Sequence, residues 1–203
     1  MGRKTIKDKL LEIMKNNNGF ITTKEAAKNN ISREHLSKLT QKGIIERARI
    51  GVYKLCDTET DMCYIYQIKH PPTIVSHLTA MYFHGFLEEE PKNIDFTVYS
   101  KYTDDRRDKS IKLHYVNYEL HDFGLIEIET KQGNTVKAYD IERSVCDIIK
   151  ANTKIDERLF YIALKNYFNS DKFDAKKLRE YADKLGVTKK TEKYIKIYCG
   201  EKV

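Results

Sequence analysis

The sequence predicts an α+β protein with a small helix-rich N-terminal domain and a larger mixed domain that ends in a helical bundle. Apolar residues recur at helical spacing over the first 42 residues, alternate as in strands between residues 94 and 129, and return to helical spacing from residue 140. The 203 residues are 40% hydrophobic and 33% charged, which is enough apolar material to bury cores. Nine glycines and three prolines exclude collagen-like and Pro-rich disordered classes.

The N-terminal part opens with two predicted helices. Apolar residues at helical spacing predict the first over residues 4–15, and the run of Asn and Gly at residues 16–19 ends it. Thr22 and Glu25 have the spacing of a capping box, in which each side chain accepts a hydrogen bond from the backbone of the other residue. A short second helix is therefore expected over residues 23–28.

A third helix and a hairpin complete this part. Ser32 is a favourable N-cap for a helix that extends to about Lys42, and Gly43 suits the position just after its end. Strand-forming residues then lie on both sides of a turn near residues 49–51, which predicts a hairpin. Three helices followed by a hairpin predict a winged helix-turn-helix domain over residues 1–57.

The third helix of such a domain enters the DNA major groove, so its exposed polar residues are candidate base readers. Arg33 and Lys38 can donate to guanine, and Gln41 can pair with adenine. Ser32 and Lys42 suit phosphate contacts, while the basic hairpin residues suit a wing that contacts the backbone or the minor groove. The predicted DNA-binding residues are Ser32, Arg33, Glu34, Ser37, Lys38, Gln41, Lys42, Arg47, Arg49 and Lys54.

The distribution of charge supports a nucleic-acid partner. The formal charge is +7 over residues 1–57, −5 over residues 58–171 and +5 over residues 172–203. Compact basic regions commonly bind phosphate, because binding releases counterions from the nucleic acid. The basic C-terminal part is a possible second DNA-binding face, and the alternative is a solvated helical surface. Its candidates are Lys176, Lys177, Arg179, Lys184, Lys189, Lys190, Lys193 and Lys196.

A polar acidic segment at residues 57–61 marks a predicted domain boundary, and the second domain is expected to span residues 62–203. A helix is predicted over residues 76–86, followed by three half-buried strands at 94–99, 111–115 and 125–129. Four helices should follow, beginning at Asp140, Asp156, Asp174 and Thr188.

Enzymatic, metal and membrane functions find little support. Cys56, Cys63, His70 and His77 recur every seven residues, but zinc sites usually bring cysteines together over two to four intervening residues. Glu129 and Lys131, with Asp95 on an earlier strand, weakly match the acidic pattern of metal-dependent nucleases. No signal peptide or transmembrane stretch is recognised. We therefore expect a cytoplasmic protein that is not an enzyme and uses no metal or cofactor.

Three segments together resemble the AbiEi-type antitoxins of bacterial abortive-infection, or type IV, toxin–antitoxin systems. Residues 39–53 are similar to the end of the family's helix-turn-helix and its wing. Residues 74–86 are similar to its Ser-His-x-Ser-Ala segment, and residues 139–149 to its Glu-Arg-Thr helix. Thr79 and Ser144 replace the usual serine and threonine, and both replacements keep a hydroxyl.

The resemblance implies a protein with two functions. The N-terminal domain would repress its own operon at inverted repeats in the promoter, and the second domain would counteract a nucleotidyltransferase-like toxin without forming a stable complex. The polar candidates of the second domain are Ser76, His77, Thr79 and Arg143. They equally fit local roles, Arg143 as a first-turn residue paired with Glu142 or Asp147.

Two other functions stay open at this point. One is a winged-helix regulator whose second domain senses a ligand or oligomerises, and the other is a metal-dependent nuclease.

Overall fold

The computed structural model describes residues 5–103 and 108–200, and the chain divides by its internal contacts into two compact units. The N-terminal unit runs to Pro71 and also includes residues 129–135, whereas the C-terminal unit comprises residues 72–128 and the chain from Val136 onward. The boundary expected at residues 57–61 concerns independent folding and stays a prediction. The division by internal contacts lies after Pro71, which is further along the chain than the predicted boundary.

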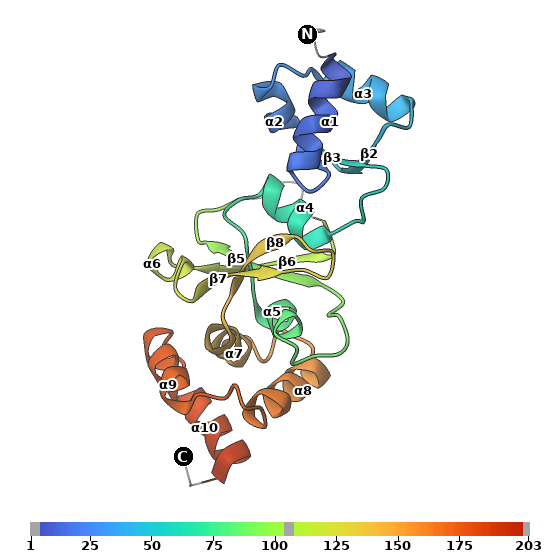
Figure 1. The fold of residues 1–203 in the computed structure, drawn as a ribbon. Helices are drawn as coiled ribbons and strands as arrows, with labels where there is room; N and C mark the ends of the chain where they lie inside the picture. Colours follow the sequence, from blue (N-terminus) through green and yellow to red (C-terminus); the bar gives the residue numbers. More distant parts are fainter. Residues whose placement is uncertain (1–4, 104–107, 201–203) are drawn as a thin grey trace. The chain divides into compact units, whose positions relative to one another are not determined.

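Helices and a small sheet make up the N-terminal unit (Figure 1). In the described residues its elements are α1 (Ile6–Asn16), β1 (Phe20–Thr22), α2 (Thr23–Lys28), α3 (Arg33–Gln41), β2 (Ile45–Arg49), β3 (Val52–Leu55) and α4 (Met62–Lys69). The three predicted helices and the hairpin are confirmed within one or two residues. Helix α4 was not predicted.

Side-chain caps fix where these helices begin. The Thr22 hydroxyl accepts from the Glu25 backbone N–H at 3.1 Å, as expected for α2. The Glu25 carboxylate accepts instead from the side chain of Asn17, so the second half of the predicted capping box is wrong. A complete capping box occurs at the start of α1, where Thr5 and Asp8 each accept from the other's backbone N–H.

The core of the N-terminal unit joins its first three helices to the hairpin. From α3 only Leu36 and Leu39 enter this core, which leaves the rest of that helix toward solvent. The sheet has the strand order β1-β3-β2, with every pairing antiparallel and Phe20 opposite Lys54. The core residues are Leu10, Met14, Ile21, Ala26, Ile31, Leu36, Leu39 and Ile45.

Helix α4 packs against this small sheet, because Ile65 forms a second apolar cluster with Phe20 and Val52. Its N-cap is Asp61, whose carboxylate accepts from the Tyr64 backbone N–H. The same carboxylate, only 3% exposed, accepts hydrogen bonds from Thr130 and Asn134. Asp61 therefore both caps α4 and connects it to the segment that contains Thr130 and Asn134.

A five-stranded mixed sheet and helices form the C-terminal unit. Its strand order is β6-β5-β4-β8-β7; β5 pairs antiparallel with β4 and parallel with β6, and β4 pairs parallel with β8. The elements are β4 (Ile74–Val75), α5 (His77–Phe83), β5 (Ile94–Tyr99), β6 (Ile111–Val116), α6 (Tyr118–His121), β7 (Leu125–Glu129), β8 (Thr135–Tyr139), α7 (Ile141–Lys150), α8 (Glu157–Phe168), α9 (Ala175–Lys184) and α10 (Thr188–Cys199).

Two layers of helices follow the sheet. Helices α5 and α7 pack together on one face of it, and α8, α9 and α10 lie beyond them (Figure 1). All four predicted C-terminal helices are confirmed, three of them capped by the expected carboxylates of Asp140, Asp156 and Asp174. The predicted helix at 76–86 is shorter, because Gly85 adopts a positive φ of 84° after it. Strand β5 is buried along its whole centre and does not alternate as expected.

Candidate nucleic-acid interface

Helix α3 carries the predicted base readers on its exposed side. The Ser32 hydroxyl accepts from the His35 backbone N–H at 3.3 Å and so begins the helix, while Gly43, with a φ of 65°, follows its end. Leu36 and Leu39 hold the opposite side in the core. Among the candidates, Ser32, Arg33, Glu34, Ser37, Lys38, Gln41 and Lys42 are all exposed. Base-reading side chains require this arrangement, which leaves them available to a duplex.

The hairpin presents fewer basic groups than the sequence predicts. Arg47 is exposed, but Arg49 is only half-exposed and its guanidinium lies 5.1 Å from the centre of the Tyr66 ring. Lys54 is 8% exposed, and its ammonium donates to the Thr58 carbonyl at 2.8 Å and pairs with Glu46 at 3.1 Å. We therefore remove Lys54 from the predicted interface, because its charge is already paired inside the unit.

The basic residues of the C-terminal helices also differ in exposure and in pairing. Lys177 forms ion pairs with Asp140 and Glu142, and Arg179 pairs with Glu192, so both serve internal contacts. The exposed candidates are Lys176, Lys184, Lys189, Lys190, Lys193 and Lys196.

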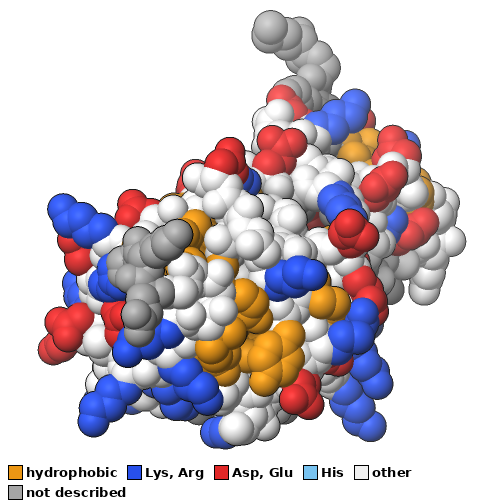
Figure 2. Space-filling view, turned by 90° about the horizontal axis from the view of Figure 1, so that it is seen from below, with side chains coloured by type: hydrophobic (Ala, Val, Ile, Leu, Met, Phe, Trp, Pro, Cys, Tyr) orange, Lys and Arg blue, Asp and Glu red, His pale blue; other side chains and the backbone are white. Residues whose placement is uncertain are grey.

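The surface of these helices is not uniformly basic either. Tyr161 of α8 and Ile197 of α10 are exposed, and Figure 2, which looks toward the C-terminal helices, shows hydrophobic side chains with Lys and Arg around them. A second DNA-binding face over these helices stays a prediction.

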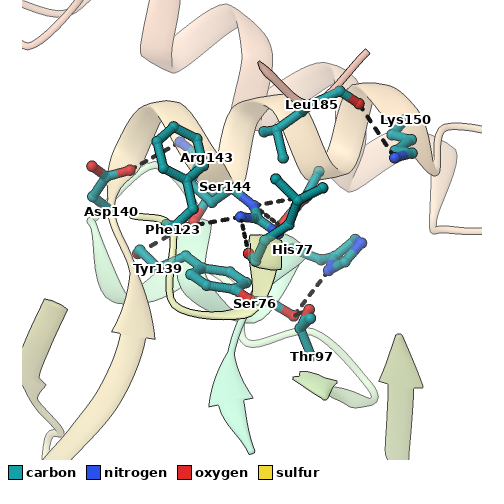
Figure 3. A network of polar contacts seen from close by, with 12 residues as sticks. Ser76, His77, Thr97, Phe123, Tyr139, Asp140, Arg143, Ser144, Lys150 and Leu185 are labelled. Atoms are coloured by element: carbon teal, nitrogen blue, oxygen red, sulfur yellow. Dashed lines mark hydrogen bonds and ion pairs between the residues drawn. The ribbon is translucent and has the colours of Figure 1, made fainter. Parts of the chain in front are cut away.

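Arg143 of α7 lies at the centre of a buried polar network in the C-terminal unit (Figure 3). It is completely buried, and its Nη1 donates to the carbonyl oxygens of Leu120 and Phe123 at 2.8 and 2.9 Å. Its Nε contacts both carboxylate oxygens of Asp147, one turn further along the helix, at 3.1 and 3.2 Å. The contacts favour a structural role for Arg143 over a surface functional one.

Ser76, His77 and Thr79 are likewise buried. The Ser76 hydroxyl accepts from Thr97 and contacts His77 Nδ1, while the Thr79 hydroxyl accepts from the Asp95 backbone N–H at 2.8 Å. These bonds tie the start of α5 to strand β5. All four polar candidates of the second domain are therefore buried and make hydrogen bonds inside the fold.

His77 also has an unusual environment. Its backbone has a φ of 51°, which is uncommon for residues other than glycine, and its ring stacks on that of His114 with centroids 3.5 Å apart. His114 Nε2 in turn contacts the Asp95 carboxylate at 2.7 Å. Burial, reinforced by the positive charges of His114 and Lys112, holds the pKa of His77 well below its usual range. No local sequence pattern indicates that His114 lies on His77, because the two residues are 37 positions apart.

Metal and membrane sites do not emerge from the described part of the chain. Over residues 5–103 and 108–200, no group of three or more His, Cys, Asp or Glu side chains is placed to hold a metal ion. Over the same ranges, no helix has both the length and the apolar character required to cross a membrane.

Three helices, a hairpin and an exposed polar face on the third helix define a winged helix-turn-helix DNA-binding domain. Residues 8–55 match the family described as "Transcriptional regulator, AbiEi antitoxin". The match agrees with the predicted resemblance to AbiEi-type antitoxins, and it covers less than half of the chain. No curated protein matches the chain. The family match ends at Leu55, before the C-terminal unit begins.

Proposed function

We propose that this protein is the antitoxin and transcriptional autorepressor of a bacterial type IV toxin–antitoxin operon. The N-terminal unit binds inverted repeats of double-stranded DNA in its own promoter, and the C-terminal unit counteracts a nucleotidyltransferase-like toxin without a stable complex. Both functions operate in the cytoplasm, and neither involves catalysis by this chain. The family match over residues 8–55 supports the regulatory half of the proposal.

One observation carries the DNA-binding half: α3 presents Arg33, Lys38 and Gln41 to solvent while Leu36 and Leu39 anchor it in the core. Arginine, lysine and glutamine are the residue types that read guanine and adenine in the major groove. Exposed Arg47 at the hairpin supplies a phosphate contact beside this helix. The interface is therefore smaller than the sequence predicts, with α3 as its main part.

The DNA-binding test uses the full chain and a duplex from its own promoter. Fluorescence anisotropy should show that R33A/K38A loses its preference for the promoter over random DNA, since each lost base contact costs about 1–3 kcal/mol. The control K7A/K15A removes two exposed lysines from α1 of the same unit and should keep the preference. An unchanged preference in R33A/K38A would contradict the assignment of α3.

The antitoxin test uses the same variant in cells that express the neighbouring toxin gene. Because the proposal assigns neutralisation to the C-terminal unit, R33A/K38A should rescue growth while failing to repress a promoter–reporter fusion. Loss of both rescue and repression in a folded variant would show that neutralisation depends on DNA binding, and the two-function proposal would be wrong.

The exposed C-terminal lysines are tested separately. The double reversal K189E/K190E should reduce the dependence of promoter affinity on salt if α10 contacts phosphate, because fewer counterions are then released. A salt dependence equal to that of the natural sequence would remove the second DNA-binding face from the proposal.

A further inference from the structure

The C-terminal unit contains a cavity of about 430 Å³ that neither DNA binding nor the polar core explains. One wall is the His77–His114 stack, and strand β6, the end of α7 and the segment after α7 supply the rest. This volume is within the range of small-molecule sites, and it is too small to enclose a DNA duplex. The residues that matter here are His77, Lys112, His114, Lys150 and Lys154.

Three lysines from separate segments converge on this cavity. Lys112 comes from β6, Lys150 is the last residue of α7, and Lys154 follows that helix. Lys150 and Lys154 are exposed, and Lys112 is half-exposed. The ammonium groups of Lys112 and Lys150 donate to the backbone carbonyls of Lys154 and Leu185, and an ammonium carries three N–H donors, so each keeps donors for a ligand.

The carboxylates beside these lysines are already paired. Asp147 lines the cavity but is held by Arg143, and Asp95 is held by His114. The cavity therefore keeps an excess of positive charge. The low pKa of His77 has the same origin in part, because Lys112 and Lys150 add to the burial that disfavours its charged form. A bound anion would offset this repulsion.

The walls of the cavity are fixed in shape. The positive φ of His77 is strained for a residue other than glycine and persists only where the surroundings hold it. Here Ser76 and the His114 ring hold it in place.

We propose that this cavity binds a small phosphorylated molecule, with its phosphates on Lys112, Lys150 and Lys154. This site goes beyond the proposed function, and it uses no residue of the DNA-binding helix. Lysine is a common phosphate ligand, and a cluster of three lysines suits a group that carries more than one phosphate.

Isothermal titration calorimetry on the full chain, without DNA, tests the proposal with ATP, tripolyphosphate and adenosine. ATP and tripolyphosphate should both bind saturably and adenosine far more weakly, because the lysines carry most of the affinity. The variant K150A/K154A should weaken ATP binding at least tenfold. Both side chains are exposed, so the variant should fold, and thermal unfolding checks this.

The control K137A/K165A removes two exposed lysines of the same unit that do not line the cavity, and it should bind ATP as the natural sequence does. The single reversal K154E should reproduce the loss. Absence of saturable ATP binding, or equal losses in K150A/K154A and in the control, would overturn the proposal. It would also fall if K150A/K154A weakened only duplex binding, because the lysines would then be a DNA contact.

Discussion

The two units use the same kinds of polar side chain in opposite ways. In the N-terminal unit, Arg33 and Lys38 lie exposed on a helix whose other side is apolar. In the C-terminal unit, Arg143 is also on a helix but is completely buried and held by three hydrogen-bonding partners. A polar residue within a helix can therefore be a ligand reader or a core element. Only the number of its fixed partners distinguishes the two roles.

Removing Arg143 should give the largest effect. In R143M the buried carboxylate of Asp147 loses its partner, and the carbonyls of Leu120 and Phe123 lose their donor. Breaking a buried ion pair on one side costs about 3–5 kcal/mol of unfolding free energy. Urea denaturation of the full chain, followed by circular dichroism, measures the loss.

The double variant R143M/D147L is the matched control, since it removes both charges. It should regain much of the stability that R143M loses. If R143M lost less than about 1 kcal/mol of unfolding free energy, Arg143 would contribute little to the stability of the fold.

A smaller effect is expected at Gly124, which packs against the same network. Its φ is 79°, and an added Cβ would lie 2.9 Å from the Arg143 Cβ. G124A should therefore lower the free energy of unfolding, because it adds both backbone strain and overpacking.

Gly85 provides the comparison for this variant. It has a similar φ of 84° but no atom within 4 Å of an added Cβ, so G85A reports the backbone strain alone. We expect G124A to cost about 1–3 kcal/mol more than G85A, the usual range for overpacking. If G124A and G85A lost equal unfolding free energy in thermal or urea unfolding, the residues around Gly124 would be shown to move aside at little cost.

The smallest effect is expected on the exposed side of α3. R33A/K38A removes two exposed side chains from outside the core, so its unfolding free energy should stay within about 0.5 kcal/mol of the natural value. Urea denaturation checks this, and a loss above about 1 kcal/mol would mean that these residues support the fold as Arg143 does. The same measurement shows whether a DNA-binding defect of this variant has a structural origin.

Much of the secondary structure could be predicted because its signals are local. Thr22, Ser32 and Asp140 cap helices by bonds to residues three positions away, so the cap and its helix are visible together in the sequence. Gly43 marks a helix end by its own conformational freedom. The short helix α4 escaped prediction because its start lies in a polar segment that reads as a linker.

The candidate site was predictable only where its function depends on exposure at a regular spacing. The apolar positions Leu36 and Leu39 define the buried side of α3, and the exposed positions follow from helical geometry. Lys54 was assigned to the wing because a strand pattern alone does not show that Glu46 and the Thr58 carbonyl hold its ammonium.

The sequence by itself determined the caps, the third helix, its exposed face and the hairpin, since each depends on residues a few positions apart. The tertiary structure alone decided that Asp61 is anchored by Thr130 and Asn134, that Arg143 is buried, and that His77 stacks on His114. Those contacts join residues tens of positions apart, and burial changes the energetics of a charge in a way that its local pattern does not record. The lysine-lined cavity has the same origin, because it exists only where β6 meets the end of α7.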